Sequence, residues 1–220
     1  MPAGPPTNGL IGSWTLDDNA GSVARDSSPN ANNGALLNGI TWTTGRTGSA
    51  TAHTATSNQH IRIPNSTSLN TITTALTASA WIRPTSPTVG SYQGIITRQV
   101  GTSYSDQWFL DLVGGKPTFS ITTVNTTRTV TAPNIATANT WVHLTGTYDG
   151  TTIRLYVNGT QVATTTATGA LRTATTPLII GANQNTATAN TAQEQFRGTI
   201  DAVTIHNRAL TPTEIAALAR

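Results

Sequence analysis

Two turn dipeptides, each placed between short runs of alternating side chains, constrain the fold most strongly. Asp149-Gly150 separates Trp141–Tyr148 from Thr152–Val157, and Asn158-Gly159 separates that second run from Thr160–Thr166. Both dipeptides tolerate the positive φ angles that a two-residue type I′ turn requires. Apolar and polar residues alternate along the runs, as they do in a strand with one buried face. The sequence therefore predicts a three-stranded antiparallel meander.

Comparable runs rich in Val, Ile, Thr, Trp and Tyr recur along the chain, separated by Gly, Pro, Asn and Ser. They cover Leu10–Leu16, His60–Pro64, Leu76–Arg83, Gly94–Val100, Trp108–Val113, Thr118–Val124, Leu178–Gly181 and Phe196–His206. One short helix is expected at the C-terminus, because Thr211, Pro212 and Glu214 form a capping box with proline in the first turn. We therefore predict an all-β, two-sheet antiparallel jelly-roll sandwich with one short C-terminal helix. Residues 1–8 are interpreted as a linker stub and residues 9–220 as a single domain.

The composition supports this class and excludes several others. Of 220 residues, 46 are Thr and only 10% are charged, which disfavours an all-α protein. The net charge is +3, and the basic residues are scattered with a single lysine, so nucleic acid is not an expected partner. The chain contains no cysteine, which excludes disulfides and thiolate chemistry. No apolar run approaches the length of a membrane span, so none is expected.

Several segments, in order, resemble the laminin-G-like, concanavalin A-like jelly-roll domains of bacterial secreted proteins. The segments are Gly9–Asp18, Asp26–Gly34, Ile61–Pro64, Leu76–Pro84, Trp141–Gly159 and Phe196–Leu210. The resemblance implies the jelly-roll fold over nearly all of residues 9–218 and a secreted or cell-surface location. It does not fix the activity, because this fold hosts lectins, adhesion modules, glycosidases and lyases.

A cation site is expected near the N-terminus. The loop at 26–33 offers carboxylate and amide oxygens, which are the ligands that calcium prefers. In the resembling domains this loop lies near the closing strand, which here carries Asp201. We therefore predict a structural Ca²⁺ with the ligands Asp17, Asp26, Asn30, Asn33 and Asp201. The alternative is that Asp26 begins an Asx turn and that Asp201 holds a loop by hydrogen bonds.

Sugar contacts are expected where aromatic faces and planar polar groups occur together in loops. Three segments between strands have this mixture, near residues 91–99, 104–108 and 183–195. The predicted ligand-binding residues are Tyr92, Arg98, Gln99, Tyr104, Asp106, Trp108, Asn183, Gln184 and Gln195.

Catalytic alternatives find less support. A glycosidase needs two carboxyl groups beside the scissile bond, and the Glu-x-Asp-x-x-Glu strand of glucan hydrolases with this fold is absent. Asp106 and Asp111 nevertheless bracket Trp108 and could both face one cleft. A lyase could use the groups of Gln59-His60-Ile61-Arg62, although His60 is better explained as a strand residue. His143 is interpreted as a packed structural residue.

The leading interpretation is a non-catalytic carbohydrate-binding or adhesion module of a secreted bacterial protein. It recognises a polysaccharide or other glycan and holds either an attached catalytic domain or a cell surface on it. The alternatives are a polysaccharide-degrading lyase or glycosidase domain and a protein-binding laminin-G-like module.

Overall fold

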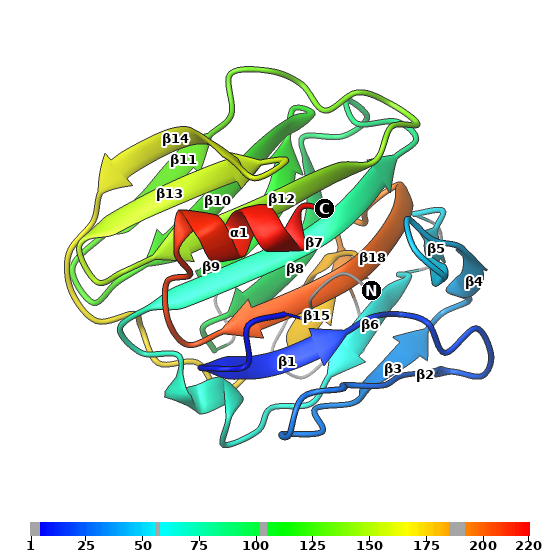
Figure 1. The fold of residues 1–220 in the computed structure, drawn as a ribbon, viewed down its shortest axis with the longest axis horizontal. Coiled ribbons are helices and arrows are strands. Elements are labelled where there is room, and N and C mark those ends of the chain that lie inside the picture. Colours follow the sequence, from blue (N-terminus) through cyan, green and yellow to red (C-terminus); the bar gives the residue numbers. More distant parts are fainter. Residues whose placement is uncertain (1–4, 56–57, 102–104, 185–191) are drawn as a thin grey trace.

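The computed structural model describes residues 5–55, 58–101, 105–184 and 192–220, and in these residues the chain forms a sandwich of two antiparallel sheets (Figure 1). The predicted jelly-roll class is confirmed. No helix in the described part of the chain is long and apolar enough to span a membrane.

The first sheet has the order β14-β13-β12-β7-β18-β5-β4, with β1 added beside β18. Its strands are β1 (Leu10–Trp14), β4 (Thr41–Thr44), β5 (Ser49–His53), β7 (Leu76–Pro84), β12 (Val142–Tyr148), β13 (Thr152–Val157), β14 (Thr160–Thr166) and β18 (Gly198–His206). β18 has two neighbours on one side: β5 pairs with its first half and β1 with its second half, and a bulge between Asp201 and Thr204 lies between the two.

The second sheet has the order β11-β10-β9-β8-β15-β6-β3-β2. Its strands are β2 (Val23–Ala24), β3 (Gly34–Leu37), β6 (His60–Ile63), β8 (Tyr92–Gln99), β9 (Asp106–Val113), β10 (Lys116–Thr122), β11 (Thr127–Thr131) and β15 (Leu178–Ile180). A short 3-10 helix, η1 (Leu69–Thr71), precedes β7, and a small hairpin pairs β16 (Asn183–Gln184) with β17 (Ala192–Gln193).

The core lies between the two sheets and is filled by large side chains that meet small ones. Trp14 and Trp108 are fully buried. The ring of Phe119 on β10 lies directly against the Cα of Gly146 on β12, where any side chain would overlap it. Close packing of this kind makes the core sensitive to the addition of a single methyl group.

The predicted C-terminal helix is confirmed as α1 (Pro212–Leu218), including its capping box. It lies over strands β12 and β7 on the outer face of the first sheet (Figure 1). Ile215 packs with Tyr156 and Leu210, and the Trp81 indole N–H donates to the Leu218 carbonyl at 3.3 Å. The helix therefore covers part of the outer face of the first sheet. The outer face of strands β10 and β11, in the second sheet, carries polar side chains.

The meander is confirmed, but one of its turns differs from the prediction. Asn158 and Gly159 both have positive φ, as a type I′ turn requires. The other turn also has two central residues, but they are Gly150 and Thr151 and not Asp149 and Gly150, because the Asp149 N–H donates to the Thr152 carbonyl at 3.2 Å. Of the two, only Gly150 has a positive φ, so this is not a type I′ turn. Asp149 Oδ1 accepts hydrogen bonds from the backbone N–H groups of Thr151 and Thr152, which stabilises the turn.

Candidate functional site

The outer face of β10 and β11 carries rows of hydroxyl groups. The inward residues of β10, Phe119 and Ile121, lie in the core, so the residues between them face outward. Cross-strand hydroxyl oxygens pair at 3.2, 2.9 and 3.1 Å in Thr118–Thr131, Ser120–Thr129 and Thr122–Thr127. Part of the Thr and Ser excess therefore forms an ordered polar surface on this sheet.

β9 continues this polar face next to the hydroxyl rows. Strand pairing places Phe109 opposite Ser120 and Asp111 opposite Thr118. On the other side of β9, Asp111 pairs with Gly94 of β8. Trp108, Leu110 and Leu112 alternate with these residues and point into the core. The chain thus sets a carboxylate and an aromatic ring beside the hydroxyl groups.

The hairpin of β16 and β17 closes one side of this face. The backbone at Ala182 and Asn183 crosses β8 so closely at Gly94 that a side chain there would overlap it. Gly94 N–H donates to the Glu194 carbonyl at 2.8 Å. The Asn183 amide group donates to Glu194 Oε2 at 3.1 Å. Glycine at position 94 is therefore what allows the polar hairpin to lie against the sheet.

These elements enclose a cavity of about 360 Å³, which we call the acidic cavity. It is lined by Tyr92, Gln99, Asp106, Phe109, Asp111, Ser120, Thr127, Thr129, Asn183, Gln193 and Glu194. The lining contains three carboxylates and, among the described residues, no Lys, Arg or His. It combines an exposed aromatic ring with amide, hydroxyl and carboxylate groups, which are the groups that contact sugars.

The carboxylates of the acidic cavity lie in an environment that disfavours their charged forms. Burial and, to a smaller extent, the Glu194 charge raise the pKa of Asp106 to about 7, although a hydrogen bond with Asn183 acts in the opposite direction. Burial also raises the pKa of Asp111 well above its usual range, and the charges of Asp106 and Glu194 add to this effect. Near neutral pH the protonated forms of these two carboxyls are therefore favoured, and a nearby cation would shift the balance toward the carboxylates.

Asp111 is the most unusual member of this set. It is only 1% exposed, yet neither carboxylate oxygen has a hydrogen-bond partner among the described residues. The Ile95 backbone N–H lowers its pKa, although that contact falls short of hydrogen-bond geometry. Buried carboxylates are normally paired or hydrogen-bonded, because an isolated one is costly. An unpartnered carboxyl at a cavity wall is a group that a ligand can satisfy.

Four of the predicted ligand-binding residues meet at the acidic cavity: Tyr92, Gln99, Asp106 and Asn183. The side chain of Tyr92 is 43% exposed and provides the aromatic surface. Asp106 and Asp111 both line this cavity, as the sequence had suggested for one cleft. The sequence prediction missed the contributions of β10 and β11, because which strands lie beside β9 becomes visible only in the folded sheet.

Arg98 does not lie at the cavity, so its predicted role as a ligand contact is not supported. It is 1% exposed and points to the core side of β8. Its guanidinium donates to the Leu69 and Ala174 carbonyls at 2.6 and 2.9 Å and to the amide oxygens of Asn65 and Asn70 at 2.9 and 2.6 Å. Arg98 thus ties two loops to the sheet and is a structural residue.

The remaining predicted contacts fall into three groups. Trp108 is fully buried, so it cannot stack on a sugar. It packs in the core and is not the ligand contact that the sequence predicted. Gln195 is half-buried, and its amide group donates to the Ala192 carbonyl at 2.8 Å, outside the cavity lining. Gln184 lies in β16, and Tyr104 lies outside the described residues.

The predicted calcium ligands near residue 26 have other partners. Asp26 accepts four hydrogen bonds, from Ser13 N–H at 2.8 Å, Ser28 N–H at 2.8 Å, Ser28 O–H at 2.7 Å and Asn32 N–H at 2.7 Å. Asn33 Oδ1 accepts from the Asp26 N–H. The Asn30 amide group donates to two backbone carbonyls. These hydrogen bonds organise the loop, and calcium binding by its oxygens stays a prediction.

Asp17 and Asp201 make hydrogen bonds to a different segment of the chain. Both hold the turn at 45–49: Asp17 Oδ1 accepts from the Ser49 N–H at 2.9 Å, and Asp201 Oδ2 accepts from the Arg46 N–H at 2.7 Å. Burial raises the pKa of Asp201 to about 6. Within the described part of the chain no three His, Cys, Asp or Glu side chains gather as metal ligands do. The three carboxylates among the five predicted ligands form no such group, and a calcium role stays a prediction.

Gln59, His60 and His143 make contacts inside the folded domain. Gln59 and His60 are buried, and the Gln59 amide group donates to the Gly39 carbonyl at 2.8 Å. His143 Nε2 lies 2.8 Å from Ser79 Oγ, and its ring packs on Trp81 with centroids 5.2 Å apart. His143 is therefore a packed structural residue, as predicted.

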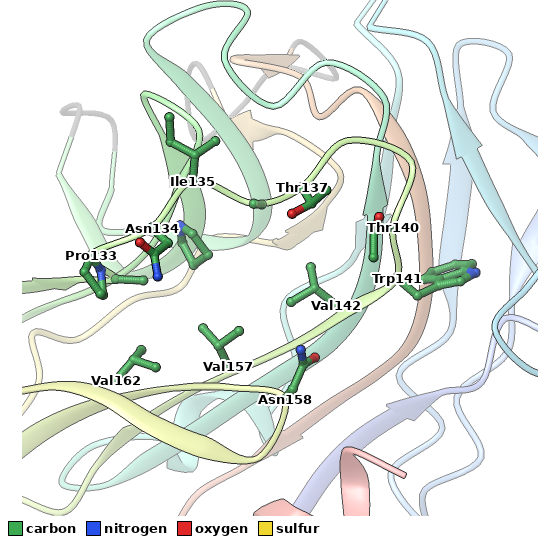
Figure 2. Close-up of a pocket in the computed structure, with 13 residues that line it drawn as sticks. Pro133, Asn134, Ile135, Thr137, Thr140, Trp141, Val142, Val157, Asn158 and Val162 are labelled. Atoms are coloured by element: carbon green, nitrogen blue, oxygen red, sulfur yellow. The ribbon is translucent and has the colours of Figure 1, made fainter.

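A second hollow, of about 200 Å³, lies between the 132–140 segment and the hairpin of β13 and β14 (Figure 2). Val142, Val157 and Val162 line it together with Pro133 and Ile135, and the Trp141 ring points away from these valines. Its lining is mostly apolar and contains no charged residue among those described. It therefore offers few partners for sugar hydroxyls, and the acidic cavity is the better candidate.

Comparison with solved structures supports the fold across the whole chain. Domain 4 of AbnA, a GH43 extracellular arabinanase from Geobacillus stearothermophilus, solved in complex with arabinotriose, has a TM-score of 0.73 at 19% identity, covering 98% of this chain and 100% of that domain. The binding domain of Paraclostridial Mosquitocidal Protein 1 has a TM-score of 0.71 at 20% identity, covering 96% of this chain and 52% of that one.

The ligand-binding domain of botulinum neurotoxin serotype D, solved with N-acetylneuraminic acid, has a TM-score of 0.73 at 14% identity. The match includes 96% of this chain and 50% of that domain. This chain therefore spans about half the length of each toxin domain. No curated protein sequence matches the chain. A sequence profile matches residues 55–216, and on this basis the chain belongs to the concanavalin A-like lectin/glucanases superfamily.

Proposed function

We propose that the chain is a non-catalytic carbohydrate-binding module that takes a glycan in the acidic cavity. The observation that carries this proposal is the convergence of Tyr92, amide groups, carboxylates and paired hydroxyls in one hollow. Sugars need an aromatic face for their C–H groups and planar polar groups for their hydroxyls, and this lining offers both. Structural neighbours solved with arabinotriose and with sialic acid add support from the fold.

The setting of such a module is part of the same proposal. The arabinanase domain and the toxin domains belong to extracellular enzymes or toxins, which supports a secreted or cell-surface bacterial protein. In that setting the module holds an attached catalytic domain or a cell on a polysaccharide. Single-site affinities in the micromolar to millimolar range, about 4–8 kcal/mol, suffice for this role.

Affinity electrophoresis against a panel of native polysaccharides tests the proposal. We expect one polymer to retard the protein and Tyr92→Ala to abolish most of the retardation, because Tyr92 supplies the exposed ring. Ile135→Ala is the matched control: its side chain is 49% exposed and lines the apolar hollow instead. If the Ile135 variant were no longer retarded while the Tyr92 variant still was, the binding site would be the hollow in Figure 2.

A catalytic role makes a different prediction for the same cavity. Asp106 and Asp111 share its wall, so a glycosidase is the enzyme class that this geometry favours. Reducing-end release from the polymer that binds, lost in Asp106→Asn, would replace the binding proposal with a hydrolase. Retardation by immobilised matrix proteins but by no glycan would favour a protein-binding module.

A further inference from the structure

The acidic cavity has a charge pattern that restricts which sugars fit it. Asp106, Asp111 and Glu194 line it together, and no cationic side chain stands among the described lining residues. The charges act on one another, since Glu194 and Asp106 both oppose ionisation of Asp111. A sugar carboxylate or sulfate would bring a negative charge to a site whose ionisable lining groups are all acidic and which offers no counter-ion. Anionic glycans are therefore poor ligands for this site.

Two observations point to a ligand that carries a positive charge. Asp111 is 99% buried, and both of its oxygens are without a hydrogen-bond partner among the described residues. Asp106 Oδ1 is likewise buried and unpartnered. Elsewhere in the chain buried acids are satisfied internally, as Asp26 is by four donors. The cavity carboxylates thus hold acceptor capacity that the folded chain leaves unused.

We infer that the acidic cavity is specific for amino sugars with a free ammonium group, such as the glucosamine units of a deacetylated glycan. This inference rests on the proposed glycan-binding function and names its ligand class. An ammonium group supplies both a compensating charge and N–H donors for the empty carboxylate oxygens. The hydroxyl pair Ser120–Thr129 and the Tyr92 ring provide contacts for the rest of the sugar.

An ammonium group from a lysine side chain would have the same charge. The surroundings favour the sugar, because the cavity wall has several hydroxyl and amide groups that a slender aliphatic chain would leave without partners. The exposed Tyr92 ring adds a flat surface for sugar C–H groups.

Isothermal titration at about pH 6, where a glucosamine amino group is protonated, tests the inference with four probes. They are a glucosamine hexamer, an N-acetylglucosamine hexamer, sialyllactose and oligolysine. We expect the glucosamine hexamer to bind at least tenfold more tightly than its N-acetylated counterpart and sialyllactose not to bind. Asp111→Asn and Asp106→Asn should reduce that preference to below threefold. Both variants should fold, because burial already favours the neutral form of each carboxyl and an amide has nearly the same shape.

Asp18→Asn serves as the charge-matched control, because Asp18 pairs with the exposed Arg25 in the connection between β1 and β2. It should leave the preference unchanged. Equal binding of both hexamers, or tight binding of another neutral glycan that Tyr92→Ala abolishes, would overturn the amino-sugar inference while the proposed function stands. Binding of oligolysine alone, or of no probe and no polysaccharide, would overturn both.

Discussion

Replacing Asp26 with alanine separates two roles for the loop at residues 26–33. The carboxylate accepts from three backbone N–H groups, of Ser13, Ser28 and Asn32, and from the Ser28 hydroxyl, all at 2.7–2.8 Å. Alanine would leave buried donors without partners, each at about 1–3 kcal/mol. We therefore expect the Asp26→Ala variant to lose roughly 3–5 kcal/mol of unfolding free energy. For a domain of this size the loss lowers Tm by about 6–20 °C.

The assay is thermal unfolding of wild type and variant, each with calcium and with a chelator. If Asp26 organises the loop by hydrogen bonds, the loss of Tm is the same in both conditions. Asp18→Asn is the control for removing a carboxylate from the same region, and its surface ion pair is worth about 1 kcal/mol or less.

Two results would refute this reasoning. One is a variant that melts within about 2 °C of wild type, which would mean that the four hydrogen bonds contribute little. The other is a wild-type protein that calcium stabilises and an Asp26 variant that it does not. The second result would restore Asp26 as a calcium ligand and would require its loop to rearrange on binding the ion.

Three further perturbations test the packing and the charges. Arg98→Met should lower the unfolding free energy by about 3–5 kcal/mol in urea titrations, because it orphans buried acceptors, and should leave glycan retardation of the folded fraction unchanged. Gly146→Ala should cost about 1–3 kcal/mol, since its methyl group overlaps Phe119, and a second change, Phe119→Leu, should recover part of this loss. In the folded protein the pKa of Asp106 is about 7, above its usual value, so the wild type loses stability as pH rises from about 4 to 7. Asp106→Asn should flatten this dependence of unfolding free energy on pH. Above pH 7 the variant should be more stable than wild type by up to roughly 4 kcal/mol. A slope unchanged in this variant would contradict the assigned burial effect.

Local pattern predicted most of the longer strands, but it missed β2–β5 and β11 and did not show which side each residue faces. The alternation along β12 and β13 gave the meander, and the capping box at Thr211 gave α1. Arg98 was misplaced because β8 is irregular between Gly94 and Ile96 and again after Arg98, which breaks simple alternation. Its guanidinium then reaches loop carbonyls, at Leu69 and Ala174, that come from distant parts of the chain.

Some residues of the candidate site could be predicted from the sequence and others could not. Tyr92, Asp106 and Asn183 were predictable because they sit in polar segments at strand ends. Ser120 and Thr129 were not, since nothing in an isolated Thr-rich strand shows that its neighbour in the sheet is β9. Asp111 reads as one polar residue within an apolar run, and its lack of a partner depends on the register of three strands.

The charge distribution of the chain argues that the acidic cavity was not assembled for stability. Only nine residues are acidic, and three of them line this one cavity, although twelve Lys and Arg residues were available to pair with them. Arg98 lies on the same strand as Tyr92, yet it donates to neutral oxygens on the core side. Unpaired buried carboxylates lower stability. The other buried acids of this chain have hydrogen-bond donors, four at Asp26 and two at Asp201, and the sequence could have supplied donors here in the same way. Departures of this kind from local consistency are expected where binding, and not folding, sets the residue, which is why ligand selectivity is the property to measure at Asp111.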